Sequence, residues 1–348
     1  MAYGFEQSLW LKESTTYGTA EDMSVGTRPV ILCRPNISLA KTVERIQIGH
    51  LRSGGASIQY SEDSEVLESV AGSISGIVPV GQSTSPSSSV PDTSGFLVLL
   101  KHALGKVITS GTSSYTHTFG WNDKLFPGFS LAHNICGATY VYDGMQVQSV
   151  KLSGKVGGPL EYTDEFIGKT ERQLAAITAV VSHPAYVVPA HWLIQYITAK
   201  IDAVTVDLTG FDFEFANELE SGEDKSYNLG SGSRVCLAKS GHTVKGTFNR
   251  RHKRDSTNVS KFYAKFLSGA IATLEINLTH PTAPASFMGQ IFFGFVKFRG
   301  KTPEASDRGW IMEDAPFEAF SLNDATNLIQ IMDLAAAPVT ATGTYDGS

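Results

Sequence analysis

The stretches Val204-Thr-Val-Asp-Leu208 and Phe211-Asp-Phe-Glu-Phe215 alternate apolar and polar residues. Side chains of a β-strand point to the two faces of a sheet in turn, so a period of two places every apolar residue of a run on one face. These two runs therefore predict half-buried strands, and they set the β character expected of the chain.

Other β-prone segments lie on both sides of these runs. Residues 288–298, Met-Gly-Gln-Ile-Phe-Phe-Gly-Phe-Val-Lys-Phe, are rich in aromatic residues, and Val147, Val150 and Leu152 mark another strand. Aromatic and β-branched residues are enriched in strands. Glycine-rich breaks separate the segments, as expected where strands end in turns. The sequence predicts a mostly β protein.

Three short helices are expected beside the strands. Residues 96–105 place apolar residues at helical spacing and stop at Gly105. A third helix is predicted over about 170–181, with Leu174, Ile177 and Val181 on one face. The second predicted helix would be capped by Ser256 or Asn258, carry Phe262, Tyr263, Phe266 and Leu267, and end at Gly269.

The two halves of the chain pass through similar elements in the same order, which indicates an internal duplication. Each half has a strand with a central glycine, a loop, a helix that starts at a phenylalanine and ends at a glycine, a strand pair and an acidic-aromatic segment. Chance similarity between β-rich segments remains the alternative. The matched anchors are Gly76 with Gly246, Phe96 to Gly105 with Phe262 to Gly269, Gly144 with Gly294, and Phe166 with Phe317.

This order predicts two tandem β-sandwich or small-barrel domains, each with a short flanking helix. The prolines around residues 183–189 favour an extended link between them. The Ser- and Pro-rich residues 79–94 are expected to form a flexible loop inside the first domain. The predicted parts are an N-terminal arm (1–35), a first domain (36–172), a linker (173–189), a second domain (190–333) and a flexible C-terminal tail (334–348).

Composition narrows the classes of function. The chain has 348 residues and a net charge of −6, so a DNA-wrapping protein, which is normally basic, is disfavoured. No apolar run approaches the roughly 20 residues that span a bilayer. The N-terminal residues have no basic region followed by an apolar core, so no secretory signal is expected.

No motif for catalysis or for a cofactor stands out. Patterns typical of a nucleophile elbow, a phosphate-binding loop or a zinc protease are missing from the sequence. His183 and His191 have no acidic residue at a useful spacing, which argues against a metal site. We therefore expect no enzyme activity, no cofactor and no metal. The three cysteines have no metal-ligand spacing and are expected to be free thiols buried as small apolar residues: Cys33, Cys136 and Cys236.

Carboxylates and tryptophans leave one weaker alternative, a carbohydrate-binding or glycosidase β-sandwich. Asp164 and Glu165 are neighbours, so on a strand they point to opposite faces and cannot form an acid/base pair. A solvated strand edge is the simpler reading of these two residues. A sugar platform would need several co-facial tryptophans, but the four in the chain are isolated: Trp10, Trp121, Trp192 and Trp310.

The sharpest charge feature is Arg250-Arg-His-Lys-Arg254, which is expected in a loop between a strand and a helix. It can be a solvated loop, a contact to DNA, or a docking site for an acidic surface of another copy. Exposed ion pairs contribute only about 0–1 kcal/mol each, so only a repeated network of them could stabilise docking between copies. The predicted contact joins Arg250, Arg251, Lys253 and Arg254 to Glu218, Glu220 or Asp224 of a neighbouring copy.

Five segments, taken in order, resemble the major tail tube proteins of long-tailed, siphovirus-like bacteriophages. The likeness is clearest before residue 170, while residues 79–94 and 250–254 depart from it. The matching segments are Leu9-Trp-Leu-Lys-Glu-Ser-Thr-Thr-Tyr-Gly-Thr-Ala20, Tyr115-Thr-His-Thr-Phe119, Leu125-Phe-Pro-Gly-Phe-Ser-Leu131, Tyr142-Asp-Gly-Met-Gln-Val-Gln-Ser-Val-Lys-Leu152 and Pro159-Leu-Glu-Tyr-Thr-Asp-Glu-Phe-Ile-Gly-Lys169.

The resemblance implies a structural virion protein, assembled in the bacterial cytoplasm, that stacks as rings into a tube with an acidic lumen. DNA would pass through the tube without specific binding. Two tube folds per chain imply trimeric rings with pseudo-sixfold symmetry, with hexameric rings as the alternative. The opposite charges of the basic and acidic stretches, rather than the resemblance, predict that the basic stretch makes a ring-to-ring contact. Implied partners are the tail terminator, tape measure and distal tail proteins, with no membrane. A terminator, a baseplate ring or an injection-system tube of the same fold is the alternative function.

Overall fold

The computed structural model describes most of the chain and is almost entirely β, as predicted. Its strands are antiparallel wherever they pair. The described residues are 7–23, 31, 33–51, 58–79, 95–110, 115–121, 127–135, 138–174, 196–228, 232–251, 261–279, 288–300, 312–320 and 327–333.

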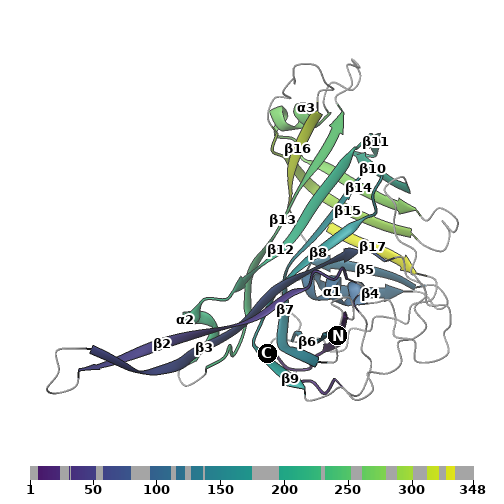
Figure 1. Cartoon of the computed structure of the whole chain (residues 1–348). Helices are drawn as coiled ribbons and strands as arrows, with labels where there is room; N and C mark the ends of the chain where they lie inside the picture. The colour runs from purple at the N-terminus through teal and green to yellow at the C-terminus, as the bar shows by residue number, and fades with distance from the viewer. Residues whose placement is uncertain are drawn as a thin grey trace, which may run out of the picture.

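Eight strands pair side by side and form what we call the eight-strand run. Figure 1 shows it crossing the molecule from the lower left to the top. In order of pairing, the run consists of β2 (Ser38–Leu51), β3 (Ile58–Ile77), β8 (Glu161–Gly168), β7 (Ala138–Lys155), β12 (Gly210–Glu220), β13 (Ala238–Arg251), β16 (Met312–Ala319) and β15 (Met288–Phe298).

Two further sets of strands branch from β7 and β15. The first has the order β1–β6–β7–β9 and the second the order β10–β14–β15–β17, after which β17 pairs with β5 and β5 with β4. β11 (Val204–Val206) pairs with β10. The bounds are β1 (Gln7–Glu13), β6 (Phe129–Ile135), β9 (Thr170–Leu174), β10 (Ile197–Ile201), β14 (Ala272–Thr279), β17 (Asn327–Asp333), β5 (Tyr115–Trp121) and β4 (Gly105–Ser110).

The pairings of the first half recur in the second. The order β2–β3–β8–β7 matches β12–β13–β16–β15, and β1–β6–β7–β9 matches β10–β14–β15–β17. The register corrects two sequence anchors. Val147 lies opposite Phe166 as Phe298 lies opposite Phe317, so Gly144 corresponds to Phe295 and not to Gly294. Gly246 lies opposite Phe317, and the glycine opposite Phe166 is Gly72, not Gly76. A shift of four residues keeps the same face of a strand, so alternation in the sequence does not detect it.

Gly72 and Gly246 are equivalent points of close approach between strands. A Cβ on Gly246 would lie 2.5 Å from the carbonyl oxygen of Asp212 and 2.5 Å from the ring of Phe317. A Cβ on Gly72 would collide with the backbone oxygen of Ser38. Each glycine lets a neighbouring strand approach where a side chain would force it away, and Gly246 also leaves room for the ring of Phe317.

Gly246→Ala is therefore expected to lower the free energy of unfolding by about 1–3 kcal/mol, the usual cost of overpacking. Urea unfolding followed by circular dichroism measures it. Gly222→Ala is the matched control, because a Cβ there has no atom within 4 Å. Equal stability of the two variants would contradict the assigned close approach.

The core is continuous between the two halves. One cluster of buried residues includes side chains from both of them. Phe213 packs edge to face against Phe215 and Phe293, while Phe248 stacks on Phe317 with ring centroids 4.9 Å apart. The strand that links the halves is β12, which pairs with β7 from Gly210↔Lys155 to Ala216↔Ser149.

Two of the three predicted helices are confirmed. α1 (Gly95–Leu104) and α3 (Lys261–Ser268) are each followed by a glycine with left-handed backbone, Gly105 and Gly269. The proposed caps of α3 lie outside the described residues. The third helix is wrong over its first residues, because Thr170–Leu174 forms β9 and pairs with β7. That long-range pairing overrides a weak helical spacing. A short helix, α2 (Glu223–Ser226), follows β12.

The β2–β3 hairpin projects from the body, as Figure 1 shows at the lower left. Within the described residues, the outer parts of β2 and β3 pair only with each other. From Glu44 to Leu51 this arm extends about 25 Å at the usual rise per residue. We call Glu44–Leu51 and Ile58–Leu67 the arm.

Several predicted segments lie partly or wholly outside the described residues. Residues 80–94 of the Ser- and Pro-rich loop, residues 175–189 of the linker and the tail 334–348 are among them. The segment predicted as an N-terminal arm contains β1, which pairs along its whole length with β6. The proposed domain bounds stay predictions.

Candidate functional site

The two charged stretches singled out in the sequence lie at opposite ends of the β12–β13 hairpin. Glu218 and Glu220 lie near the end of β12, and Asp224 lies in α2 just beyond it. Arg250 and Arg251 are the last residues of β13. Along β13 the two ends are about 40 Å apart. The stretches therefore do not meet within one chain.

The prediction that the whole basic stretch forms an exposed loop is wrong for its first residues. Arg250 and Arg251 belong to β13, opposite Glu313 and Met312 of β16. The side chain of Arg250 is only 7% exposed, because it lies on the core side of the strand like Phe248 two residues earlier. Lys253 and Arg254 lie outside the described residues. At the other end, Glu220 forms a 2.8 Å ion pair with Lys225.

The segment between β12 and β13 contacts β3 just after Leu67, at the base of the arm. The Tyr227 hydroxyl donates a 3.0 Å hydrogen bond to the carbonyl oxygen of Glu68, and the Glu68 N–H donates to that of Gly232. Arg234 donates to the carbonyl oxygen of Gly168 at 2.9 Å, and its guanidinium lies 5.8 Å from the centre of the Tyr227 ring. These contacts connect the second half of the chain to β3 and β8 of the first.

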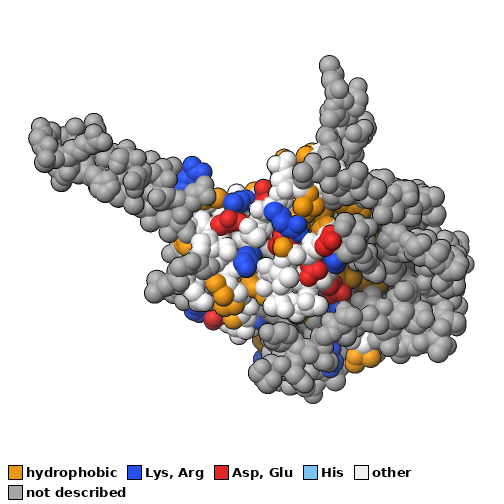
Figure 2. Space-filling model, turned by 90° about the horizontal axis from the view of Figure 1, so that it is seen from below, with side chains coloured by type: hydrophobic (Ala, Val, Ile, Leu, Met, Phe, Trp, Pro, Cys, Tyr) orange, Lys and Arg blue, Asp and Glu red, His pale blue; other side chains and the backbone are white. Residues whose placement is uncertain are grey.

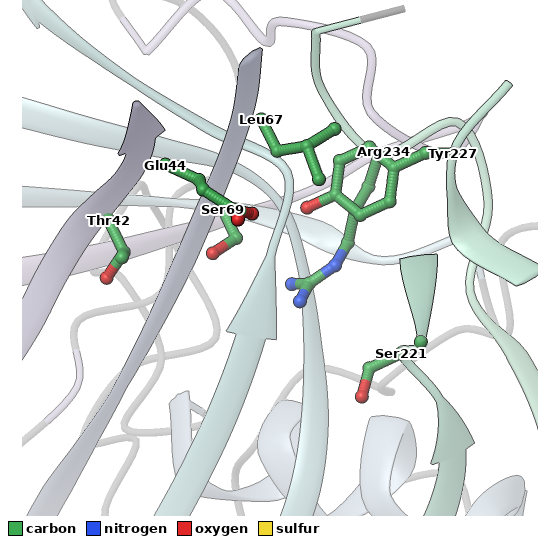
Figure 3. A pocket seen from close by; sticks show the side chains of 8 residues that line it. Thr42, Glu44, Leu67, Ser69, Ser221, Tyr227 and Arg234 are labelled. Atoms are coloured by element: carbon green, nitrogen blue, oxygen red, sulfur yellow. The ribbon is translucent and has the colours of Figure 1, made fainter. Parts of the chain in front are cut away.

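An open cavity of about 520 Å³ lies between the arm base and this segment. Figure 3 shows the Arg234 guanidinium between Tyr227 and the strands of the arm. The lining includes one acidic side chain, one basic side chain and several hydroxyl groups. Its lining comes from β2, β3 and the segment after β12: Thr42, Glu44, Leu67, Ser69, Ser221, Gly222, Tyr227 and Arg234.

Tyr227→Phe is expected to weaken this contact, because it removes the hydroxyl that binds Glu68. The loss of one hydrogen bond corresponds to about 1 kcal/mol. Hydrogen exchange of the Glu68 amide should then become about fivefold faster. Amides of β14 serve as the internal reference and should not change. An unchanged Glu68 rate would show that the hydroxyl does not hold the arm.

A buried charged cluster fastens β1 to α1. All residues of α1 are buried, including Lys101 and His102. Glu13, the last residue of β1, accepts hydrogen bonds from Lys101 at 2.6 Å and from His102 at 2.9 Å. Burial alone would raise the pKa of Glu13, but the hydrogen bonds and charges of His102 and Lys101 outweigh it and hold the pKa at about 2. Burial lowers the pKa of His102.

The expectation of a solvated strand edge at Asp164 is wrong. Asp164 and Glu165 do point to opposite faces, but Asp164 is fully buried in the middle of the sheet, between Ile74 of β3 and Val150 of β7. Its carboxyl oxygens have no hydrogen-bond partner among the described residues. Burial raises the pKa of Asp164 well above its usual value. Glu165 is exposed and accepts a hydrogen bond from Ser149.

The cysteines are free thiols where the structure describes them, but they are less buried than expected. Cys33 is half-buried and Cys236 is exposed, because both lie outside the strands of the core. Burial raises the pKa of Cys33 to about 11. Cys136, His183 and His191 lie outside the described residues. In the described part of the chain, no three His, Cys, Asp or Glu residues are grouped so that they could hold a metal ion.

Charges of both signs are mixed over the described surface. Figure 2 shows Lys and Arg side chains among Asp and Glu side chains in the view from below. Ion pairs between the arm base, the run and its neighbours include Lys41–Glu68 at 3.0 Å and Lys200–Glu275 at 3.2 Å.

The sequence matches the family model described as phage tail tube protein over residues 4–319, most of the chain. The chain therefore belongs to the phage tail tube protein family, a family of structural proteins. It is a component of the virion tail. No curated protein matches the sequence. No helix in the described ranges is long and apolar enough to cross a membrane.

Proposed function

We propose that the chain is the major tail tube subunit, which polymerises as stacked rings and forms the conduit for phage DNA during ejection. Unpaired sheet edges support ring formation, because their N–H and C=O groups invite another strand. Within the described residues, β2 pairs with β3 alone, so the eight-strand run ends in an open edge. A neighbouring copy can complete that edge.

The seam between β7 and β12 supports a ring of three chains. Inside one chain, this seam joins a four-strand unit of the first half to its counterpart in the second. If the last unit joins β2 of the next chain in the same way, three chains close six units into one wall with pseudo-sixfold symmetry. Hexameric rings remain the alternative.

The separation of the charged stretches supports head-to-tail stacking. The acidic end of the β12–β13 hairpin and its basic end lie about 40 Å apart on one rigid element. When identical rings stack in one direction, the acidic end of one ring faces the basic end of the next. The proposed contact joins Glu218, Glu220 or Asp224 to Arg251, Lys253 and Arg254, while the buried Arg250 supports the strand. Further proposed partners are the terminator, tape measure and distal tail proteins.

A charge swap tests this function. Electron microscopy of purified wild-type protein should show rings and tubes. Glu218→Lys with Glu220→Lys should give rings that do not elongate, and Arg251→Glu with Arg254→Glu should do the same. The combined variant should recover tubes, because both ends are then reversed together. Wild-type protein that stays monomeric would contradict the function, and normal tubes from both single-end variants would contradict the contact.

A further inference from the structure

A row of alternating charges crosses five strands of the eight-strand run. Lys151 of β7 lies opposite Glu214 of β12, and Glu214 lies opposite Lys245 of β13. Lys245 in turn lies opposite Glu318 of β16, which lies opposite Lys297 of β15. Directly opposite residues on neighbouring strands share one face of a sheet, so these five side chains form a single row.

This row lies on the face away from the core. Glu214 is exposed, while its neighbours in β12, Phe213 and Phe215, are 0% and 3% exposed. Lys297 is likewise exposed between Val296 and Phe298, which are buried. The core face is covered by α1 and by the strands that branch from β7 and β15. The row therefore lies on the face that the chain's own core leaves uncovered.

Two more charges complete the pattern. The Nζ of Lys151 lies 3.7 Å from the carboxylate of Asp212, and Arg299 forms a 3.2 Å ion pair with Glu318. Four cations thus alternate with three carboxylates along two adjacent rows. We call these seven residues the charge strip: Lys151, Asp212, Glu214, Lys245, Lys297, Arg299 and Glu318.

The alternation of cations and carboxylates along the strip weakens the attraction of its lysines for a polyanion such as DNA. Lys245 lies directly opposite Glu214 on one side and Glu318 on the other, so the Cβ atoms of both glutamates lie about 5 Å from its own. A phosphate that approaches Lys245 also approaches Glu214 and Glu318, and the attraction and repulsion nearly cancel. Net negative charge elsewhere on the chain is screened beyond about 8–10 Å, so it protects these lysines less than their direct neighbours do.

We infer that the charge strip is a DNA-facing surface on which Glu214 and Glu318 prevent the lysines and Arg299 from binding phosphate. This inference rests on the proposed function, since closing the run into a tube wall with its covered face outward places the strip on the bore. Where the resemblance implies an acidic lumen, the inference places a locally neutral strip on it. DNA then slides because every cation of the charge strip has a neighbouring carboxylate.

The test is DNA binding by Glu214→Gln with Glu318→Gln, a nearly isosteric pair of changes at one exposed and one partly exposed position. The probe is a fluorescent duplex of about 20 base pairs, titrated between about 20 and 150 mM NaCl. Three freed cations predict that the logarithm of the binding constant gains a slope of about −3 against the logarithm of salt, relative to wild type. Binding at the lowest salt should be at least about tenfold tighter.

The matched control is Asp202→Asn with Glu275→Gln, which changes the net charge equally. These carboxylates pair with Lys265 and Lys200, at 2.5 and 3.2 Å, outside the strip. The control frees only Lys265 and Lys200, so it should gain a slope of about −2 at most. Equal increases in DNA affinity and salt slope for both variants would mean that net charge alone determines binding. No increase for the strip variant would mean that Glu214 and Glu318 do not prevent its cations from binding phosphate. Either result overturns the inference.

Ring formation is scored by electron microscopy on the same wild-type preparation. Rings together with an unchanged strip variant would overturn the inference and leave the tube function standing. A wild-type protein that never forms rings would remove the tube function, whatever its variants do with DNA. The two failures are thus read from separate measurements.

Discussion

Glu13→Gln is expected to lower the free energy of unfolding at pH 7 by about 3–5 kcal/mol, the usual cost of breaking a buried ion pair by removing one partner. Lys101 is 0% exposed, and its ammonium donates a 2.6 Å hydrogen bond to the Glu13 carboxylate. Glutamine keeps the shape of the side chain but removes the charge. The buried ammonium then loses its contact with the Glu13 carboxylate. Urea unfolding measures the loss.

The pH dependence gives an independent check of this pair. Because the pKa of Glu13 is lowered from 4.5 to about 2, its contribution to stability is complete above about pH 4.5 and is lost as the pH falls toward 2. That shift corresponds to about 3 kcal/mol. The difference between wild type and Glu13→Gln should therefore shrink across this window. The double variant Glu13→Gln with Lys101→Met is the control and should recover most of the loss. A constant difference across the window would contradict the pairing.

Asp164→Ala is expected to raise the free energy of unfolding at pH 7 by about 1–3 kcal/mol, the cost of a buried polar group without a partner. The strand register places Ala315 at the equivalent position of the second half, opposite Phe248 as Asp164 lies opposite Ile74. Alanine is therefore compatible with this packing. Urea unfolding at several pH values measures the gain.

The sign of the pH dependence is opposite to that of Glu13. The pKa of Asp164 is raised, so its cost is absent below the unfolded value near 3.8 and grows as the pH rises toward the folded value. The advantage of Asp164→Ala should grow from about pH 4 upward. Asp164→Asn removes the charge but keeps a polar group. Its free energy of unfolding at pH 7 should therefore lie between those of wild type and Asp164→Ala. A less stable Asp164→Ala at pH 7 would show that the carboxyl makes a favourable contact.

The elements with strong local signals were predictable from sequence. The alternation around Phe213 defines β12, and the aromatic run 288–298 coincides with β15. Gly105 and Gly269 ended their helices as expected, because a glycine after a helix readily takes the left-handed conformation. The order of anchors identified the repeat, although the register of Gly72 needed the strand pairing.

Features that depend on distant parts of the chain were not predictable. Asp164 and Arg250 looked solvated because they are charged, yet strands far away in sequence bury both. The start of the predicted helix 170–181 became β9, because the edge of β7 was available for pairing. The Glu13–Lys101–His102 cluster and the hydrogen bond from Tyr227 to Glu68 join residues more than 80 positions apart. No local sequence pattern predicts such contacts.

Cryo-electron microscopy of an assembled tail, averaged and indexed for rotational symmetry, tests the central claim most directly. The account predicts three chains per ring, six similar four-strand units in one unbroken wall, and β2 of each chain paired with a strand of its neighbour. A ring in which β2 pairs with no neighbouring strand, or in which the two halves of a chain occupy unrelated places in the wall, would contradict it.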